Sequence, residues 1–305
     1  MALPQQQGQA TGGGADDTTT NTGDHYLRLD MKRLLLLLLM CAPAWAENNF
    51  LTDTDCVALW KMENGALTTD TIGGNTLIAR NTPTADTSDY QEGGASVDID
   101  TGDELYSTDT QLDAGFPLKS GGTGTFSFCC WFKADSLPGD GDYQVIASKR
   151  WTVPGGRSWM VALTESGGVV QPVQDIGYNS GNSSYVRGVW NAEDGALAIP
   201  SGTWCHIGVT FNNATNAYRL LGWNGTETRL REDTLADGIY LNATEFIFGA
   251  EDGTTYDDWD GHIDEAVFFK DILTADEIDQ IRLGTYGASA ATGTSNWWWR
   301  RRHNN

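Results

Sequence analysis

The sequence has little positive charge. Among its 305 residues, 19 lysines and arginines stand against 41 aspartates and glutamates, and the formal net charge is −22 at pH 7. Proteins that bind nucleic acid neutralise phosphates with basic side chains, so this composition excludes general nucleic-acid affinity. The charge fits a secreted protein that meets divalent cations or neutral glycans, and it also fits an ordinary solvated acidic surface.

Histidine is scarce, and the common catalytic motifs are missing. Two of the four histidines lie in terminal segments, which leaves His206 and His262. The chain contains no Gly-x-Ser-x-Gly, His-Glu-x-x-His or phosphate-binding loop. Glycoside hydrolysis needs two carboxyl groups at a fixed separation. The adjacent Asp264 and Glu265 would point to opposite faces of a strand, and we therefore expect a protein that is not an enzyme.

No hydrophobic run is long enough to span a membrane. The longest, Leu34–Ala42, falls far short of the roughly 20 residues that a spanning helix needs. It follows a basic pair and precedes Ala44-Trp45-Ala46, the small-x-small pattern of a signal-peptidase site. We expect residues 31–46 to be a signal peptide. The mature chain would begin at Glu47 and be secreted or displayed at the cell surface.

The two ends of the chain read as segments outside the folded domain. Residues 1–30, rich in Gln, Thr and Gly, are either a disordered extension or a misassigned gene start. Residues 287–305 have the composition of a flexible tail. That tail contains Trp297, Trp298, Trp299, Arg300, Arg301 and Arg302. Such a cluster suits contact with a membrane or envelope, and the alternative is a tail without a role.

Four cysteines would remain after cleavage of the signal peptide: Cys56, Cys129, Cys130 and Cys205. An even number in an exported chain permits disulfides. Cys129 and Cys130 are adjacent in an expected strand and so point to opposite faces, which prevents both from reaching one partner. Either one of them bridges to Cys205, or the thiols stay free and buried.

Between the terminal segments the chain alternates short strands with turns. Phe126–Phe132 and Cys205–Phe211 alternate in the period of a half-buried strand, and Glu245–Gly249 reads as a further strand. Pro-Gly, Asn-Gly and Asp-Gly pairs separate such segments. No internal repeat and no long helical stretch is evident. This pattern predicts an all-β sandwich or jelly roll.

One short helix is expected near the C-terminus. Thr274 and Glu277 have the spacing of a capping box, in which each side chain accepts a hydrogen bond from a free amide of the first helical turn. Ile278 and Ile281 then form one apolar edge. Gly284 suits the left-handed position that ends such a helix.

Five segments follow the order of motifs in a known domain family. They are Val57–Glu63, Thr69–Asn75, Thr125–Lys133, Gly202–Phe211 and Gly261–Ile278. The last contains Gly-His-Ile-Asp-Glu and then Leu-Thr-Ala-Asp-Glu-Ile. Together they resemble the laminin-G-like domains of the concanavalin A-like lectin/glucanase superfamily. The resemblance implies a jelly-roll sandwich over residues 47–286 that closes with one short helix; residues 151–200 are the least family-like.

A calcium site is one candidate function. Calcium takes six to eight oxygen ligands, and the loop from Asp70 to Asn75 offers a carboxylate, glycine carbonyls and an amide. The resemblance implies that Asp264 of the closing strand lies beside this loop, which would make Asp70, Asn75 and Asp264 a structural calcium site. The alternative is that these side chains make turn and backbone hydrogen bonds.

Sugar binding by tryptophan side chains is the second candidate function. The chain has 12 tryptophans, and sugars bind by stacking on aromatic rings while polar groups take their hydroxyls. Trp60, Trp131 and Trp204 coincide with framework strands of the family. Trp151, Trp159 and Trp190 have no framework counterpart, and we expect them to face solvent and stack on sugar.

These observations favour a secreted binding or adhesion module, directed to a polysaccharide or glycoconjugate and stabilised by calcium. A structural or interaction protein of a cell surface or virion, without a sugar site, is the main alternative. A glycoside hydrolase of the same fold is the third. The fold does not choose among them, because function depends on side chains added to it. The glucanases of the superfamily carry Glu-x-Asp-x-x-Glu on one strand face, and this chain lacks that motif.

Overall fold

The computed structural model describes residues 47–149, 158–178, 185–188, 195–252 and 257–288. All of them belong to one unit of the chain, Ala46–Asn305. Within this described part, every helix is too short or too polar to cross a membrane.

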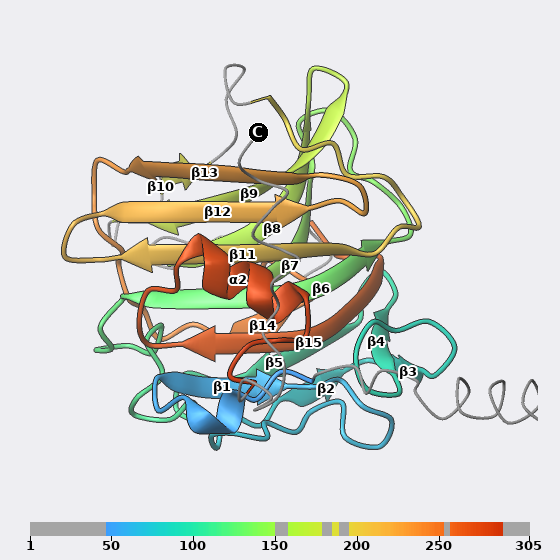
Figure 1. Ribbon diagram of the computed structural model, residues 1–305, viewed down its shortest axis with the longest axis horizontal. Coiled ribbons are helices and arrows are strands. Elements are labelled where there is room, and N and C mark those ends of the chain that lie inside the picture. Colours follow the sequence, from blue (N-terminus) through green and yellow to red (C-terminus); the bar gives the residue numbers. More distant parts are fainter. Residues whose placement is uncertain (1–46, 150–157, 179–184, 189–194, 253–256, 289–305) are drawn as a thin grey trace, which may run out of the picture. The chain divides into compact units, whose positions relative to one another are not determined.

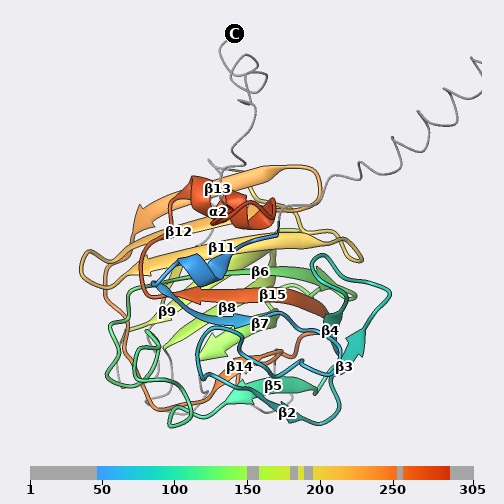
Figure 2. The ribbon, with the colours of Figure 1, turned by 60° about the horizontal axis from the view of Figure 1, so that its bottom comes forward.

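The described residues form two antiparallel sheets, which confirms the expected β-sandwich (Figure 1 and Figure 2). Sheet A has the order β13 (Thr228–Thr234), β12 (Ala217–Trp223), β11 (Cys205–Asn212), β6 (Phe126–Ala134), β15 (Gly261–Phe269), β4 (Ser96–Ile99) and β3 (Thr84–Asp86), and β1 (Cys56–Trp60) also pairs with β15. Sheet B has the order β10 (Tyr185–Gly188), β9 (Val169–Gly177), β8 (Trp159–Ser166), β7 (Tyr143–Lys149), β14 (Phe246–Phe248), β5 (Glu104–Ser107) and β2 (Ile78–Arg80).

The core lies between the two sheets and is rich in aromatic rings. The expected alternation along β6 is confirmed, because Phe126, Phe128 and Phe132 are fully buried in the main hydrophobic cluster. The expectation that this strand is half-buried is wrong: Cys129 on its other face is also buried, in a second cluster with residues of α2 (Ala275–Arg282). Phe128 lies 4.9 Å from Phe268 of β15, measured between ring centroids. Ring pairs at such distances add to the stabilisation that burial of apolar area provides.

β15, the strand that carried the family motif, organises sheet A. It pairs with β6 over its length, with β4 at its start and with β1 at its end. The register with β6 shifts between Asp264 and Val267, and Glu265 has a φ of 42°. A bulge of this kind redirects the strand and its side chains. It places Glu265 in a small acidic pocket that also contains Glu92 and Lys61.

The Glu265 carboxyl should make stability depend on pH. Burial, reinforced by the negative charge of Glu92, raises its pKa from 4.5 to about 7. A raised carboxyl pKa means that ionisation is less favourable in the folded state, so stability is lost as pH rises from about 4.5 through about 7. We expect this loss in urea-unfolding free energies between pH 4.5 and 8, and Glu265→Gln should remove about 3 kcal/mol of it. A variant with the same pH profile as the unaltered chain would contradict the assignment.

The capped helix is confirmed as α2 (Ala275–Arg282). Thr274 Oγ1 accepts a hydrogen bond from the Glu277 amide at 3.2 Å, and Glu277 Oε2 accepts one from the Thr274 amide at 2.8 Å. α2 lies across the outer face of sheet A, over β11 and β6 (Figure 1). Gly208 of β11 permits this contact, because a Cβ there would lie 2.2 Å from Cγ2 of Ile278.

The four cysteines are free and buried, which is the second of the two expected arrangements. Cys130 belongs to the main core, whereas Cys129 packs with Ile278 and Ile281 beneath α2, so the adjacent pair does face opposite ways. Burial raises the pKa of the Cys205 thiol to about 12. A thiol held protonated in this way is inert at neutral pH.

Candidate functional site

Asp70 organises the loop that was expected to bind calcium. Its Oδ1 accepts hydrogen bonds from the amides of Leu59 at 2.9 Å, Ile72 at 2.9 Å and Gly73 at 3.1 Å. Its Oδ2 accepts from the backbone amide of Asn75 at 3.1 Å and from Asn75 Nδ2 at 3.0 Å. The sequence correctly predicted that Asp70 and Asn75 lie together, and the contact is a direct hydrogen bond.

The oxygens of Asn75 also accept hydrogen bonds from groups of the protein. Its Oδ1 accepts a hydrogen bond from the Asp113 amide at 2.8 Å, and its backbone carbonyl accepts one from Trp60 Nε1 at 2.8 Å. A calcium ligand must direct oxygen lone pairs at the ion. Here the side-chain oxygens of Asp70 and Asn75 all face N–H donors, so the arrangement fits turn and backbone hydrogen bonding and does not fit a cation.

Asp264 does not join this loop. Trp60 forms a bridge with Asp70 on one side and pairs with Ala266 of β15 on the other, so β1 runs between the loop and β15. Asp264 Oδ2 instead accepts hydrogen bonds from the amides of Gln91 at 2.8 Å and Glu92 at 2.9 Å. The expectation that Asp70, Asn75 and Asp264 share one ion is therefore corrected: the long-range pairing of β1 separates them.

The calcium hypothesis can be tested on the loop itself. Asp70→Ala would leave five hydrogen bonds without their acceptor, several of them buried, and we expect a loss of about 3–5 kcal/mol in unfolding free energy. Because amides occupy the carboxylate, the loss should be equal in calcium and in chelator when measured by chemical denaturation. A destabilisation seen only in the presence of calcium would restore the metal site.

Of the three tryptophans that were expected to bind sugar, the structure describes one. Trp151 and Trp190 lie outside the described residues. Trp159, the first residue of β8, is 1% exposed. Its ring contacts Phe126 and Phe128 edge-on at centroid distances of 5.5 and 5.4 Å. The expectation that Trp159 faces solvent is wrong, because Trp159 is the first of the β8 residues whose side chains point into the core between the sheets. The continuous apolar run after it, Met-Val-Ala-Leu, is the signal of a strand buried on both faces.

A group of polar side chains gathers instead on the outer face of sheet A. Trp204, just before β11, is partly buried, and its ring centroid lies 6.0 Å from that of His262. Its Nε1 donates a hydrogen bond to Asp89 Oδ1 at 2.6 Å. Lys133 of β6 forms ion pairs with the second Asp89 oxygen and with Asp135. We call this group, Asp89, Asp98, Lys133, Asp135, Trp204 and His262, the Trp204 surface.

Three members of the Trp204 surface offer possible metal ligands. Asp98, Asp135 and His262 each present one ligand atom, and these atoms lie within 4.8 Å of one another. No second group of three or more His, Cys, Asp or Glu side chains meets this geometry in the part of the chain that the structure describes. Burial raises the pKa of Asp98, and the negative charges of Asp100 and Asp135 add to this effect, whereas His262 lowers it.

Comparison with known proteins agrees with this architecture. A family model described as the concanavalin A-like lectin/glucanases superfamily matches residues 106–279, more than half of the sequence. The chain belongs to this superfamily. Among curated proteins, none matches it.

Several solved structures are similar to this chain. Domain 4 of an extracellular arabinanase from Geobacillus stearothermophilus, solved with arabinotriose, has a TM-score of 0.52 at 16% identity, covering 75% of this chain and 98% of that one. The HCR/D W1238A mutant has a TM-score of 0.51 at 14% identity, covering 77% of this chain and 52% of that one. A Ruminococcus gnavus sialidase module, CBM40, bound to α2,3-sialyllactose, has a TM-score of 0.43 at 13% identity, covering 60% and 93%.

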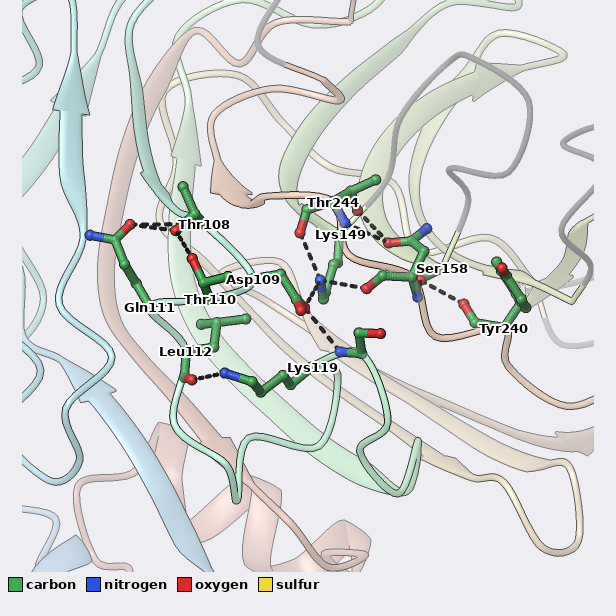
Figure 3. Close-up of polar contacts among 12 residues, drawn as sticks. Thr108, Asp109, Thr110, Gln111, Leu112, Lys119, Lys149, Ser158, Tyr240 and Thr244 are labelled. Carbon is green, nitrogen blue, oxygen red and sulfur yellow. Dashed lines mark hydrogen bonds and ion pairs between the residues drawn. The ribbon is translucent and has the colours of Figure 1, made fainter.

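This concanavalin A-like domain also contains a buried ion pair that sequence reasoning missed. Lys149, at the end of β7, has a fully buried side chain. Its Nζ donates to Asp109 Oδ1 at 2.7 Å and to the carbonyls of Asn242 at 3.0 Å and Thr244 at 2.7 Å (Figure 3). Desolvation lowers the pKa of Lys149, and Asp109 opposes that shift. The pair links two loops to sheet B, and no local signal identifies it because its members are distant in sequence.

Proposed function

We propose that the chain is a secreted, non-catalytic carbohydrate-binding module that contacts sugar at the Trp204 surface. The observation that carries this proposal is the partly exposed Trp204 indole surrounded by polar side chains. Sugars bind through CH groups stacked on an aromatic face, while charged and polar groups take the hydroxyls. Asp89 holds the indole by its Nε1, and Lys133, Asp135 and His262 supply donors and acceptors beside it.

Two further points support binding over the alternatives. The arabinanase domain of similar fold was solved with arabinotriose, which is an example of this fold type holding a sugar. Hydrolysis would need two carboxyl groups on either side of a glycosidic bond. The chain lacks the Glu-x-Asp-x-x-Glu motif that sets such a pair on one strand face in the glucanases of the superfamily.

A glycan array with the full chain tests the proposal. We expect binding to at least one polysaccharide or oligosaccharide class without depolymerisation of it. Trp204→Ala should weaken that binding at least about tenfold, which corresponds to about 1.4 kcal/mol. Trp204→Phe keeps a ring for stacking and should retain more affinity than Trp204→Ala.

Matched controls separate this surface from the rest of the molecule. Tyr106 is a partly exposed aromatic residue of β5 in sheet B, and Tyr106→Ala should leave binding unchanged. If Trp151→Ala or Trp190→Ala abolishes binding while Trp204→Ala does not, recognition belongs to the segments around those residues, as the sequence predicted. If no glycan binds, a structural or interaction role becomes the better proposal.

A further inference from the structure

We propose that Asp98, Asp135 and His262 bind a divalent transition-metal ion, with Zn²⁺ as the representative case. The proposal does not depend on sugar binding, because it rests on the arrangement of these three side chains alone. It is also separate from the Asp70 loop, where amides occupy the carboxylate oxygens.

The backbone brings the three residues together from distant parts of the chain. His262 of β15 pairs directly with Asp98 of β4 on one side and with Lys133 of β6 on the other. Asp135 follows the last residue of β6, and its amide donates a hydrogen bond to the Asp260 carbonyl at 2.9 Å. Two paired strands and a strand end therefore hold the ligands, which is a more rigid support than a loop.

The hydrogen bonds around His262 prepare its Nε2 for a ligand. Ser96 Oγ donates its proton to the Asp89 carbonyl at 2.7 Å, so it can only accept from His262 Nδ1, which lies 3.3 Å away. The proton of a neutral imidazole is then on Nδ1, and the lone pair is on Nε2. Metal-binding histidines are commonly oriented by such a bond from the other ring nitrogen.

His262 is also a buried side chain with an unused polar atom. The residue is 5% exposed. Its Nε2 lies 3.7 Å from Asp135 Oδ2, which is an ion-pair distance for a protonated ring but too long for a hydrogen bond, and Nε2 makes no hydrogen bond within the described residues. In the neutral imidazole the Nε2 lone pair faces carboxylate oxygens and is repelled by them. A cation placed between these atoms would turn that repulsion into three attractive contacts.

The neighbouring charges and exposure suit an ion with an open coordination position. Asp86 and Asp100 add negative charge near Asp98. Lys133 lies 3.7 Å from Asp135 Oδ1, which leaves the other oxygen, Oδ2, on the side of His262. The Asp135 side chain is 46% exposed, so the ion can enter from solvent. Three protein ligands with water in the fourth position is the usual arrangement of a solvent-accessible zinc site.

The ligand types select the class of metal. Calcium and magnesium prefer all-oxygen sites, and calcium needs six or more ligands. Imidazole favours zinc and other first-row transition metals. One imidazole with two carboxylates therefore favours Zn²⁺ over Ca²⁺ at this position.

Isothermal titration of the full chain with ZnCl₂, after dialysis against chelator, tests the site. We expect Zn²⁺ to bind and to raise the melting temperature, whereas CaCl₂ does neither at the same concentration. His262→Gln should weaken zinc binding at least about 100-fold, and Asp98→Asn at least about tenfold. Ser96→Ala should weaken zinc binding about 10- to 100-fold, because the imidazole loses the hydrogen bond that orients it. Asp100→Asn removes the same charge from the same neighbourhood without removing a ligand, and it should change the affinity less than about threefold.

Further measurements keep the test decisive. Circular dichroism and melting curves without metal show whether each variant is folded, and Co²⁺ can report the site through its absorption bands, which should be lost in His262→Gln. Zinc binding that is unchanged in folded His262→Gln would place the ion elsewhere, for example at the terminal His303, and would overturn the proposal. Absence of zinc binding by the unaltered chain, or equal effects of Asp98→Asn and Asp100→Asn, would also overturn it.

Discussion

Asp109→Ala is expected to destabilise the domain by about 3–5 kcal/mol, because it leaves the Lys149 ammonium buried without its counter-charge. The Lys149 side chain is fully buried, and Asp109 Oδ1 also accepts a hydrogen bond from the Ser120 amide at 2.9 Å. Loss of this carboxylate therefore affects both the lysine and the loop around Ser120. Urea unfolding followed by tryptophan fluorescence measures the change.

The double variant and a surface pair provide the controls. Asp109→Ala with Lys149→Met removes both charges, so it should be less destabilised than the sum of the single variants, and the difference is the coupling energy of the pair. Glu227→Ala breaks the ion pair between Glu227 and Arg229, whose side chains are 44% and 41% exposed. This change should lower the unfolding free energy by less than about 1 kcal/mol. Equal small effects for Asp109→Ala and Glu227→Ala would show that Lys149 is solvated.

Trp159→Ala should also cost about 3–5 kcal/mol, because it removes a large ring from a close-packed core. The ring lies among Phe126, Phe128, Phe246 and Phe268, with centroid distances between 5.4 and 6.5 Å. The remaining folded protein should keep the glycan affinity of the unaltered chain. Chemical unfolding and a binding titration on the same preparation provide both measurements.

The comparison with Trp204 makes this prediction specific. Trp204→Ala, at a partly exposed position, should cost less stability than Trp159→Ala while lowering glycan binding. The reverse result, a stable Trp159→Ala variant that no longer binds sugar, would support the original expectation that Trp159 stacks on ligand. It would also require the ring to leave the core.

Local sequence carried most of the information about the fold. The alternation in β6 and β11 predicted which side chains face the core, since successive residues of a strand point to opposite sides. The capping box of Thr274 and Glu277 predicted the start of α2 because it is made entirely by residues within one helical turn. The contact of Asp70 with Asn75 was also predictable, because a loop of six residues can close on itself.

The sequence by itself therefore determined the all-β class and the short closing helix, both of which depend on neighbouring residues. For the Asp70 loop it left calcium binding and internal hydrogen bonding open, and the positions of the amides decided between them. Only the tertiary structure decided that Trp159 lies in the core, that β1 separates Asp70 from Asp264, and that Lys149 is buried against Asp109. It alone placed Asp98 beside His262, through the pairing of β4 with β15. These contacts join residues far apart in the chain, and the register between strands, which local composition does not specify, determines which side chains meet.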